Sequence, residues 1–482
     1  MAISSTGLGS NLDVNSIVSQ LVAIEQQPIK LLQTKISTLQ TKMSVFGQVK
    51  SELSALQDAA SALMSSATWS GMSFTSGNTS ALTGTVSASA VAGSHTVSVN
   101  NLVTGQTLKS GSVTTGTTMG SSGTLTFYTG YNNTDSPSKF VSSGASDTVS
   151  VSATDTLADV VTNINAKSST LGVTASIVTT AGKQQLVIRG NSTGANAAFQ
   201  VGASSGLEQL RYMPSNIVDS SGTAIASAAT SAQDMTYGQL AADASVTIDG
   251  ITVTSSTNTV SDALSGVTLN LLAPTTTPTQ ITVGLDKATM KTKIQAFQDA
   301  YNTLYADLKT QTAYDSSTKT GGPLLGDNTA SSLQNMLRTL VGASGPATST
   351  ISRLSDLGLE IQKDGSLKTN TTKLDAALQN PTNVKNFFSA VTGTSSGNGI
   401  AKRVYDFAFG ALGVGGSVSS HSTAFQKSID QNNATIDKFN DHITAYRKQL
   451  LAQYTALDTN MAKLNSLSSY VSQQVTTWNK SG

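Results

Sequence analysis

The stretch that decides the fold lies near the N-terminus, at residues 16–64, "SIVSQLVAIEQQPIKLLQTKISTLQTKMSVFGQVKSELSALQDAASALM". After Pro28 the apolar residues recur in steps of four and three, the spacing of a helix that packs along a narrow seam. Pro28 suits a first helical turn, because its missing N–H would be unpaired there anyway. An extra three-residue step at Phe46 shifts the phase of the seam. The seam positions are Leu32, Ile36, Leu39, Met43, Phe46, Val49, Leu53, Leu56, Ala60 and Leu63.

A second seam with the same spacing lies near the other end of the chain. Its positions are Phe425, Ile429, Asn432, Ile436, Phe439, Ile443, Tyr446 and Leu450. Asn432 interrupts the apolar run, and such an Asn costs stability while it helps to select register and partner. Burial of each Leu or Ile contributes about 1.5–3 kcal/mol, whereas the cost of closing the intervening loop grows only logarithmically with its length. We therefore expect the two helices to pack on each other and to bring the chain ends together.

Between the two seams, over about 74–285, the apolar period changes to two, which indicates strands. Residues 147–178 and 244–272 are predicted to be two copies of a strand–helix–strand module, with Asp155 and Asn258 as helix caps. We also predict hairpin turns at 92–94 and at Asp364-Gly365, the second inside a helical stretch over 286–419. The fold class predicted is multidomain α+β, a terminal α-helical coiled-coil stalk formed by both chain ends with inserted β-rich α+β head domains.

This pattern predicts four domains, each built from one or two stretches of the chain. They are a terminal coiled-coil or flexible stalk (1–42 and 420–482), a helical leg domain (43–73 and 286–419), an inner head domain (74–95 and 200–285) and an outer head domain (96–199).

Composition excludes several classes of partner. Lys and Arg number 29 against 28 Asp and Glu among 482 residues, without a basic stripe that would bind a phosphate backbone, so no nucleic acid is expected. No apolar run of about 18 residues exists, so we expect no membrane insertion. The start, "MAISSTGLGSNLD", lacks the basic and apolar regions of a cleaved signal peptide. Cysteine is absent, which removes disulfides and thiolate ligands.

The sequence offers little support for catalysis. His95, His421 and His442 lack the spacing of a zinc site, so no metal is expected, and no phosphate-binding loop indicates a cofactor. Residues 202–206, "GASSG", match a nucleophile elbow with Ser204 at its centre. A serine hydrolase would also need a histidine within reach of Ser204. We predict that the chain is not an enzyme, with hydrolysis through Ser204 as a remote alternative.

Six stretches in a fixed order resemble the flagellar hook-associated protein 2 family, the flagellar filament cap proteins. They are "GLGSNLDVNSIVSQLVAIEQQPIKLLQTKISTL" (7–39), "DTLADVVTNINAKSSTLGVTASIV" (155–178), "DGITVTSSTNTVSDALSGVTLNL" (249–271), "GPLLGDNTASSLQNMLRTL" (322–340), "LSDLGLEIQKDGSLKTNTTKLDAALQNPTNVKNFF" (354–388) and "LNSLSSYVSQQV" (464–475). Each alone is generic, but their order together is specific, and they cover nearly the whole chain.

The resemblance implies a structural cap at the distal tip of the bacterial flagellar filament, which promotes flagellin folding and insertion and prevents loss of exported flagellin. It implies a ring homo-oligomer of roughly four to six subunits, with five favoured. Further implied partners are flagellin, the hook–filament junction protein and a cytoplasmic export chaperone. The location implied is extracellular, reached by type III export without a cleaved signal peptide, and a role in cell adhesion is an additional possibility. Another flagellar filament or junction component remains the alternative.

The resemblance assigns contacts with flagellin and with other subunits to the two seams. The residues are Leu21, Leu32, Ile36, Leu39, Met43, Ile429, Asn432, Ile436, Phe439, Ile443 and Leu450. Among them, Phe439, Ile443 and Leu450 are the expected contacts of the export chaperone. We also hypothesise that residues 1–42 and 455–482 become helical only against flagellin, because terminal segments with narrow apolar stripes are often ordered by their partners.

Overall fold

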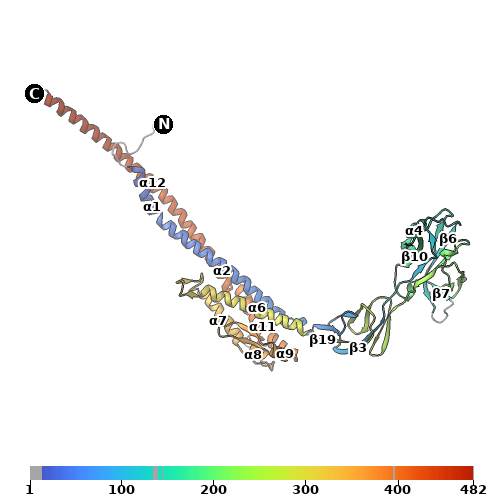
Figure 1. Cartoon of the computed structure of the whole chain (residues 1–482). Coiled ribbons are helices and arrows are strands. Elements are labelled where there is room, and N and C mark those ends of the chain that lie inside the picture. Colours follow the sequence, from blue (N-terminus) through green and yellow to red (C-terminus); the bar gives the residue numbers. More distant parts are fainter. Residues whose placement is uncertain (1–12, 134–138, 145, 395–396, 481–482) are drawn as a thin grey trace. The chain divides into compact units, whose positions relative to one another are not determined.

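The chain folds into two compact units, one helical and one rich in strands (Figure 1). The structure, a computed structural model, describes residues 13–133, 139–144, 146–394 and 397–480. The helical unit combines the described residues up to Trp69 with those from Lys287 onward, and the head unit comprises Ser70–Asp286. The predicted fold class, in which both chain ends are helical and enclose a β-rich insertion, is confirmed. The finer division into four domains stays a prediction.

Long helices dominate the helical unit. They are α1 (Val14–Glu25), α2 (Gln27–Met64), α6 (Lys287–Thr312), α7 (Asn328–Gly342), α11 (Ile400–Leu412) and α12 (Ser417–Lys480). The shorter elements are α3 (Ser66–Ser70), α8 (Leu354–Leu357), α9 (Thr371–Ala377), α10 (Pro381–Ser389), and two hairpins, β20 (Tyr314–Asp315) with β21 (Thr320–Gly321) and β22 (Leu359–Ile361) with β23 (Leu367–Thr369). Pro28 lies in the first turn of α2, as its chemistry predicts.

Helix α2 changes partner along its length, and Phe46 marks the change. The Phe46 ring meets Phe425 of α12 edge-on, with ring centroids 5.6 Å apart. Beyond it, the buried seam residues from Val49 to Leu63 belong to the same core as buried residues of α6, α7 and α11. The three-residue step at Phe46 therefore coincides with the point where the apolar face of α2 turns from one helix toward a globular core.

The head unit contains an inner and an outer β core. Its elements are β1 (Met72–Ser76), β2 (Leu82–Val86), β3 (Gly93–Asn101), β4 (Thr107–Lys109), β5 (Val113–Thr114), β6 (Gly123–Asn132), β7 (Lys139–Ser142), β8 (Asp147–Val151), α4 (Leu157–Asn165), α5 (Ser168–Leu171), β9 (Val173–Thr180), β10 (Lys183–Gly190), β11 (Ala198–Ala203), β12 (Asn216–Val218), β13 (Ala224–Ala226), β14 (Thr236–Gln239), β15 (Ala244–Ile248), β16 (Ile251–Ser255), β17 (Thr259–Leu264), β18 (Val267–Leu271) and β19 (Thr279–Leu285). The inner core lies between the sheets β1-β19-β3-β15-β16 and β17-β18-β2. The outer core joins α4 to the sheets that contain β10 and β6.

One predicted module is confirmed and the other is wrong. Residues 147–178 form strand, helix and strand, although the capping residue of α4 is Thr156 rather than Asp155. Residues 244–272 form four strands without the expected helix. Asp262 has a left-handed φ of 62° within the bulged pairing of β17 with β18, and a helix cannot continue through such a residue. Asn258, instead of capping a helix, accepts a hydrogen bond from the backbone N–H of Val103.

The two predicted hairpins also had different outcomes. The turn at Asp364-Gly365 is confirmed, since it joins β22 to β23 and Gly365 has a φ of 93°. The hairpin at 92–94 is wrong, because β2 pairs with β18 whereas β3 pairs with β15 and β19. Strand β3 has the predicted alternation, whereas Ala88 and Ala90 of the first expected strand lie beyond the end of β2. The partners of both strands come from far along the chain, which a period of two does not specify.

Candidate interaction surface of the terminal helices

The start of α12 is held to the core by a histidine–aspartate pair. His421 Nε2 lies 2.8 Å from Asp327 Oδ2. Asp327 is 9% exposed, and its Oδ1 accepts hydrogen bonds from the backbone N–H groups of Thr329 and Ala330 at the first turn of α7. One carboxylate therefore caps α7 and ties it to α12. Sequence analysis missed this role; the signal available was an Asp directly before a helical run, at residue 327.

Aromatic rings extend this attachment to α2. The His421 ring lies 4.8 Å from Phe46 and 4.5 Å from Phe425, measured between centroids. Val418, three residues before His421, is fully buried. We call Phe46, Val418, His421 and Phe425 the proximal seam. It is continuous with the large core of the helical unit, so this end of α12 has neighbours on several sides.

Farther from the core, α2 and α12 form an antiparallel pair along the predicted seam positions. Four of the predicted site residues in this pairing of α2 with α12 are buried, namely Ile36, Ile429, Asn432 and Ile443. Five others, Leu32, Leu39, Met43, Ile436 and Phe439, are half-buried. The seam spacing thus correctly indicated which side of each helix is covered, and the covering residues come from the same chain. The contacts with flagellin, other subunits and a chaperone stay predictions.

Asn432 is the exception in this apolar seam. Its side chain is 8% exposed, and its Nδ2 has no hydrogen-bond partner among the described residues. Seven residues along each helix from the contact of Phe46 with Phe425, the antiparallel register places Asn432 level with Leu39 of α2. A buried N–H donor without an acceptor costs about 1–3 kcal/mol.

A small separate cluster joins α1 to α12. Val14 and Val18 are 1% and 2% exposed and pack with Leu450, which is 8% exposed. The half-buried residues around them are Leu21, Val22, Tyr446, Leu451 and Tyr454. We call this cluster the distal seam. The prediction that the two terminal helices pack on each other is confirmed for the described residues. Val14 was missed; its spacing of four from Val18 was the available signal.

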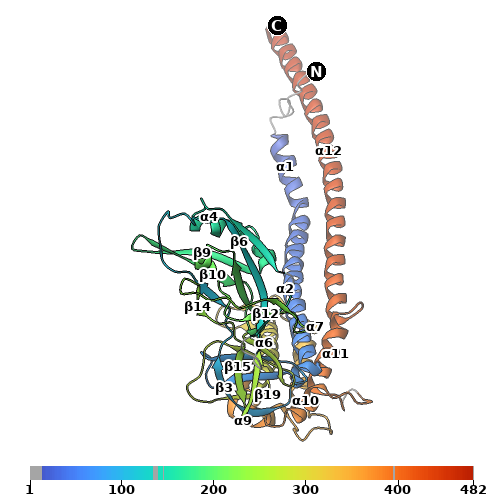
Figure 2. The ribbon, with the colours of Figure 1, turned by 90° about the vertical axis from the view of Figure 1, so that its right-hand side faces the viewer.

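Past the distal seam, α12 continues beyond the end of α1 (Figure 2). Leu457, Leu464 and Val471 recur every seven residues and are 44%, 58% and 51% exposed. We call these three residues the distal stripe. A seven-residue apolar repeat is the pattern of a helix that packs along another helix, and exposed apolar surface of this kind marks interaction sites.

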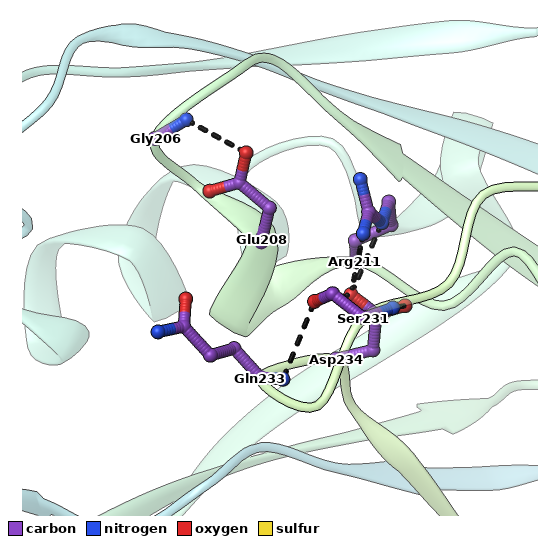
Figure 3. A network of polar contacts seen from close by, with 6 residues as sticks. All are labelled: Gly206, Glu208, Arg211, Ser231, Gln233 and Asp234. Atoms are coloured by element: carbon purple, nitrogen blue, oxygen red, sulfur yellow. Dashed lines mark hydrogen bonds and ion pairs between the residues drawn. The ribbon is translucent and has the colours of Figure 1, made fainter.

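The head unit has a polar network of its own (Figure 3). Arg211 and Asp234, 15% and 11% exposed, form an ion pair at 2.9 Å, and Asp234 Oδ2 accepts a hydrogen bond from the Ser231 N–H. The N–H of Gly206 donates to Glu208 and lowers the pKa of that carboxyl. The pair anchors one rim of a groove of about 630 Å³ whose lining includes Asp234, Gln233 and Gln209. The network shapes a loop, and no titratable pair in it is arranged for proton transfer.

The residues considered for chemistry have other partners. Ser204 Oγ accepts a hydrogen bond from the Thr124 N–H at 3.0 Å. His95 Nδ1 pairs with Asp249 at 2.7 Å, and the His442 ring stacks on Tyr446. Within the described ranges, no group of three or more His, Cys, Asp or Glu side chains is placed to hold a metal ion. The helices there also include none that is long and apolar enough to cross a membrane.

Comparison with known proteins identifies what this arrangement is similar to. The family described as "Flagellar hook-associated protein 2 C-terminus" matches residues 241–466, "Flagellar hook-associated protein 2 N-terminus" matches residues 10–106, and "Flagellin hook IN motif" matches residues 139–192. The A-type flagellar hook-associated protein 2 of Pseudomonas aeruginosa is 31% identical over 362 residues, 73% of this chain and 74% of that protein. Flagellar hook-associated protein 2 of Escherichia coli (strain K12) is 29% identical over 98% of both chains. The crystal structure of the flagellar cap protein FliD D1-D2-D3 domains from Escherichia coli is 27% identical with a TM-score of 0.50, covering 79% of this chain and 99% of that one.

Proposed function

The chain belongs to the flagellar hook-associated protein 2 family, and on this premise we propose that it is the structural cap at the distal tip of a bacterial flagellar filament. In this role it promotes the folding and insertion of flagellin and prevents the loss of exported flagellin. Proteins of this family are structural components, so the chain acts by contact rather than by catalysis. The observation that carries the proposal is the distal stripe on α12, an apolar helix face that extends past its partner within the chain.

The assembly we propose is a ring homo-oligomer of roughly four to six subunits, with five favoured. A ring at the end of a helical filament need not share the symmetry of that filament, so its contacts must adapt to unequal neighbours. A narrow apolar stripe on a long helix meets this requirement, because it can pack against several helices without a fixed set of polar contacts. We assign the distal stripe, together with Leu21 of the distal seam, to contacts with flagellin and with other subunits.

The hypothesis that the ends become helical only against flagellin needs revision. Residues 14–25 and 27–42, as well as 455–480, are helical in the single chain, and residues 1–12 and 481–482 lie outside the described residues. In the revised proposal, flagellin and neighbouring subunits cover the distal stripe of a helix that is already formed.

Binding of the export chaperone is proposed at Phe439, Ile443 and Leu450. Ile443 and Leu450 are buried and Phe439 is half-buried, in the seams with α2 and α1. A chaperone can contact them only while α12 is apart from those helices, so the complex would form in the cytoplasm, before this part of the chain folds. Export without a cleaved signal peptide, contact with the hook–filament junction protein and a final position outside the cell complete the proposal.

The central test concerns the seams and the stripe. Two double variants, Ile436→Asp with Ile443→Asp and Leu464→Asp with Val471→Asp, should each abolish capping, because charge at an apolar contact is costly. The head unit should stay folded in both, because it has cores of its own. The matched control is Asn460→Asp, an exposed position off the stripe. Flagellin assembly onto filament ends is the measurement, and undiminished assembly with either double variant would contradict the proposal.

The mass of the purified chain distinguishes a cap from a filament or junction component. A cap should stop at a closed ring, so light scattering should reach a constant mass as concentration rises. Growth without limit would favour the filament component. An ester-hydrolysis assay of Ser204→Ala beside the parent tests the remote alternative, in which activity depends on Ser204.

A further inference from the structure

The pairing of α12 with α1 and α2 is interrupted at its middle. The proximal seam belongs to the large core of the helical unit, and the distal seam is a separate small cluster. Ile36, Ile429, Asn432 and Ile436 lie between them and belong to neither cluster. Among the described residues, this middle part is a meeting of α2 with α12 alone, so each buried side chain has fewer neighbours than in the core.

Asn432 weakens this middle part further. Its Nδ2 is buried without an acceptor among the described residues, while the seam on either side of it is apolar. In water that N–H group would be hydrogen-bonded, so closing the seam over it is unfavourable and opening the seam restores the bond. The penalty therefore disfavours closure of the seam at Asn432 and does not act on the proximal seam.

The two ends of the pair differ in what holds them. At the proximal end, the His421–Asp327 pair and three rings in tilted or edge-on contact join α12 to α7 and α2. At the distal end, the contacts are apolar and come from α1, which is separated from α2 by a break at Gln26. An opening that starts at Asn432 thus releases the distal seam as a unit while the proximal seam stays closed.

We propose that Asn432 is a built-in opening point, at which the distal halves of the paired helices separate so that they can exchange the intramolecular contact for contacts with other molecules. The part of this inference that concerns assembly rests on the proposed function, and the opening itself does not. The cost at Asn432 keeps the closed pair from being so stable that it excludes an incoming helix.

Hydrogen exchange of the full-length chain tests the opening, with two adjacent asparagines as variant and control. Asn432→Leu should slow exchange of amides in 14–36 and 436–456 by about tenfold, since it removes the unpaired N–H and adds seam contact. Exchange in 418–428 should not change. Asn433→Leu, at an exposed position one residue away, should slow neither region. Equal exchange of the distal amides in both variants would overturn the proposal.

Self-association of the same variants, measured by sedimentation, tests whether assembly uses the opening. Asn432→Leu should form rings more slowly than the parent and than Asn433→Leu, because its distal seam opens less often. Ring formation at the parental rate, with slowed exchange, would overturn the use of the opening in assembly. If the parent itself formed no closed ring, the proposed function would fail instead, and the exchange result would still decide the opening.

Discussion

The two ends of α12 have the same apolar spacing and opposite surroundings. Around His421 and Phe425 the helix is surrounded by α2, α7 and α11, and its apolar residues are buried. Around Leu464 and Val471 the same repeat is more than half exposed. A seven-residue repeat therefore specifies that a helix will be covered, and it does not specify whether the cover belongs to the same chain. The contrast between these regions can be measured as a contrast in free energy of unfolding.

The largest effect is expected at the proximal seam. Phe46→Ala should lower the free energy of unfolding of the helical unit by about 3–5 kcal/mol, because it leaves a cavity between α2 and α12. Urea unfolding followed by far-UV circular dichroism measures it. The control is Phe409→Ala, whose ring is 61% exposed and whose loss should change stability by about 0.5 kcal/mol or less. Equal losses in both variants would mean that the buried ring of Phe46 contributes no more to stability than an exposed one.

A second comparison uses two aspartates that cap helices at opposite ends of the pair. Asp327→Ala should lower the free energy of unfolding of the helical unit by about 2 kcal/mol, since it removes the cap of α7 and the partner of His421 together. Asp13 accepts a hydrogen bond from the Ser16 N–H at the start of α1. Asp13→Ala should lower the free energy of unfolding by less than about 0.5 kcal/mol. The reason is that α1 can open without unfolding the core. A larger loss at Asp13 would mean that both seams unfold as one.

The α2–α6 contact of the core should respond to pH. Burial, and then the charge of Asp307, raise the pKa of Glu52 above 4.5, and neither Glu52 Oε2 nor Asp307 Oδ2 has a partner among the described residues. The protonated Glu52 is therefore favoured in the fold, and its stabilisation, complete below about pH 4.5, is lost as pH rises through the raised pKa. Glu52→Gln should remove this loss and stabilise the helical unit at pH 7 by about 1 kcal/mol.

Thermal unfolding between pH 4 and pH 8 measures the Glu52 effect, with Asp58→Asn as the control on an exposed position of the same helix. The parent and Asp58→Asn should lose stability together as the pH rises through the raised pKa of Glu52, and Glu52→Gln should lose less. Parallel curves for all three chains would show that Glu52 titrates alike in the folded and unfolded states.

The smallest effect is expected at the distal stripe. Leu464→Ala should change the free energy of unfolding by no more than about 0.5 kcal/mol, because the side chain is already 58% exposed and Ala is a strong helix former. The same urea titration as for Phe46→Ala gives the comparison directly. A loss comparable to that of a buried leucine would indicate that the stripe is covered within the single chain.

The helices were predictable because their signal is local. Steps of four and three identified the covered faces of α2 and α12, and Pro28 marked the start of α2. The 244–272 region failed because Thr259–Leu264 is compatible with a short helix or a strand, and pairing with β18 decided between them. The wrong hairpin at 92–94 has a related cause, since β2 and β3 take partners more than 140 residues away.

The sequence alone determined that both chain ends are long helices with narrow apolar seams, because side-chain period depends only on the geometry of one element. It also indicated Asn432 as the polar exception. Only the tertiary structure decided which positions meet, that His421 joins Asp327 rather than solvent, and that Asn432 is buried without an acceptor while Leu464 stays exposed. These outcomes depend on contacts between residues that are far apart in the sequence, and a local pattern does not specify which of those residues meet in the fold.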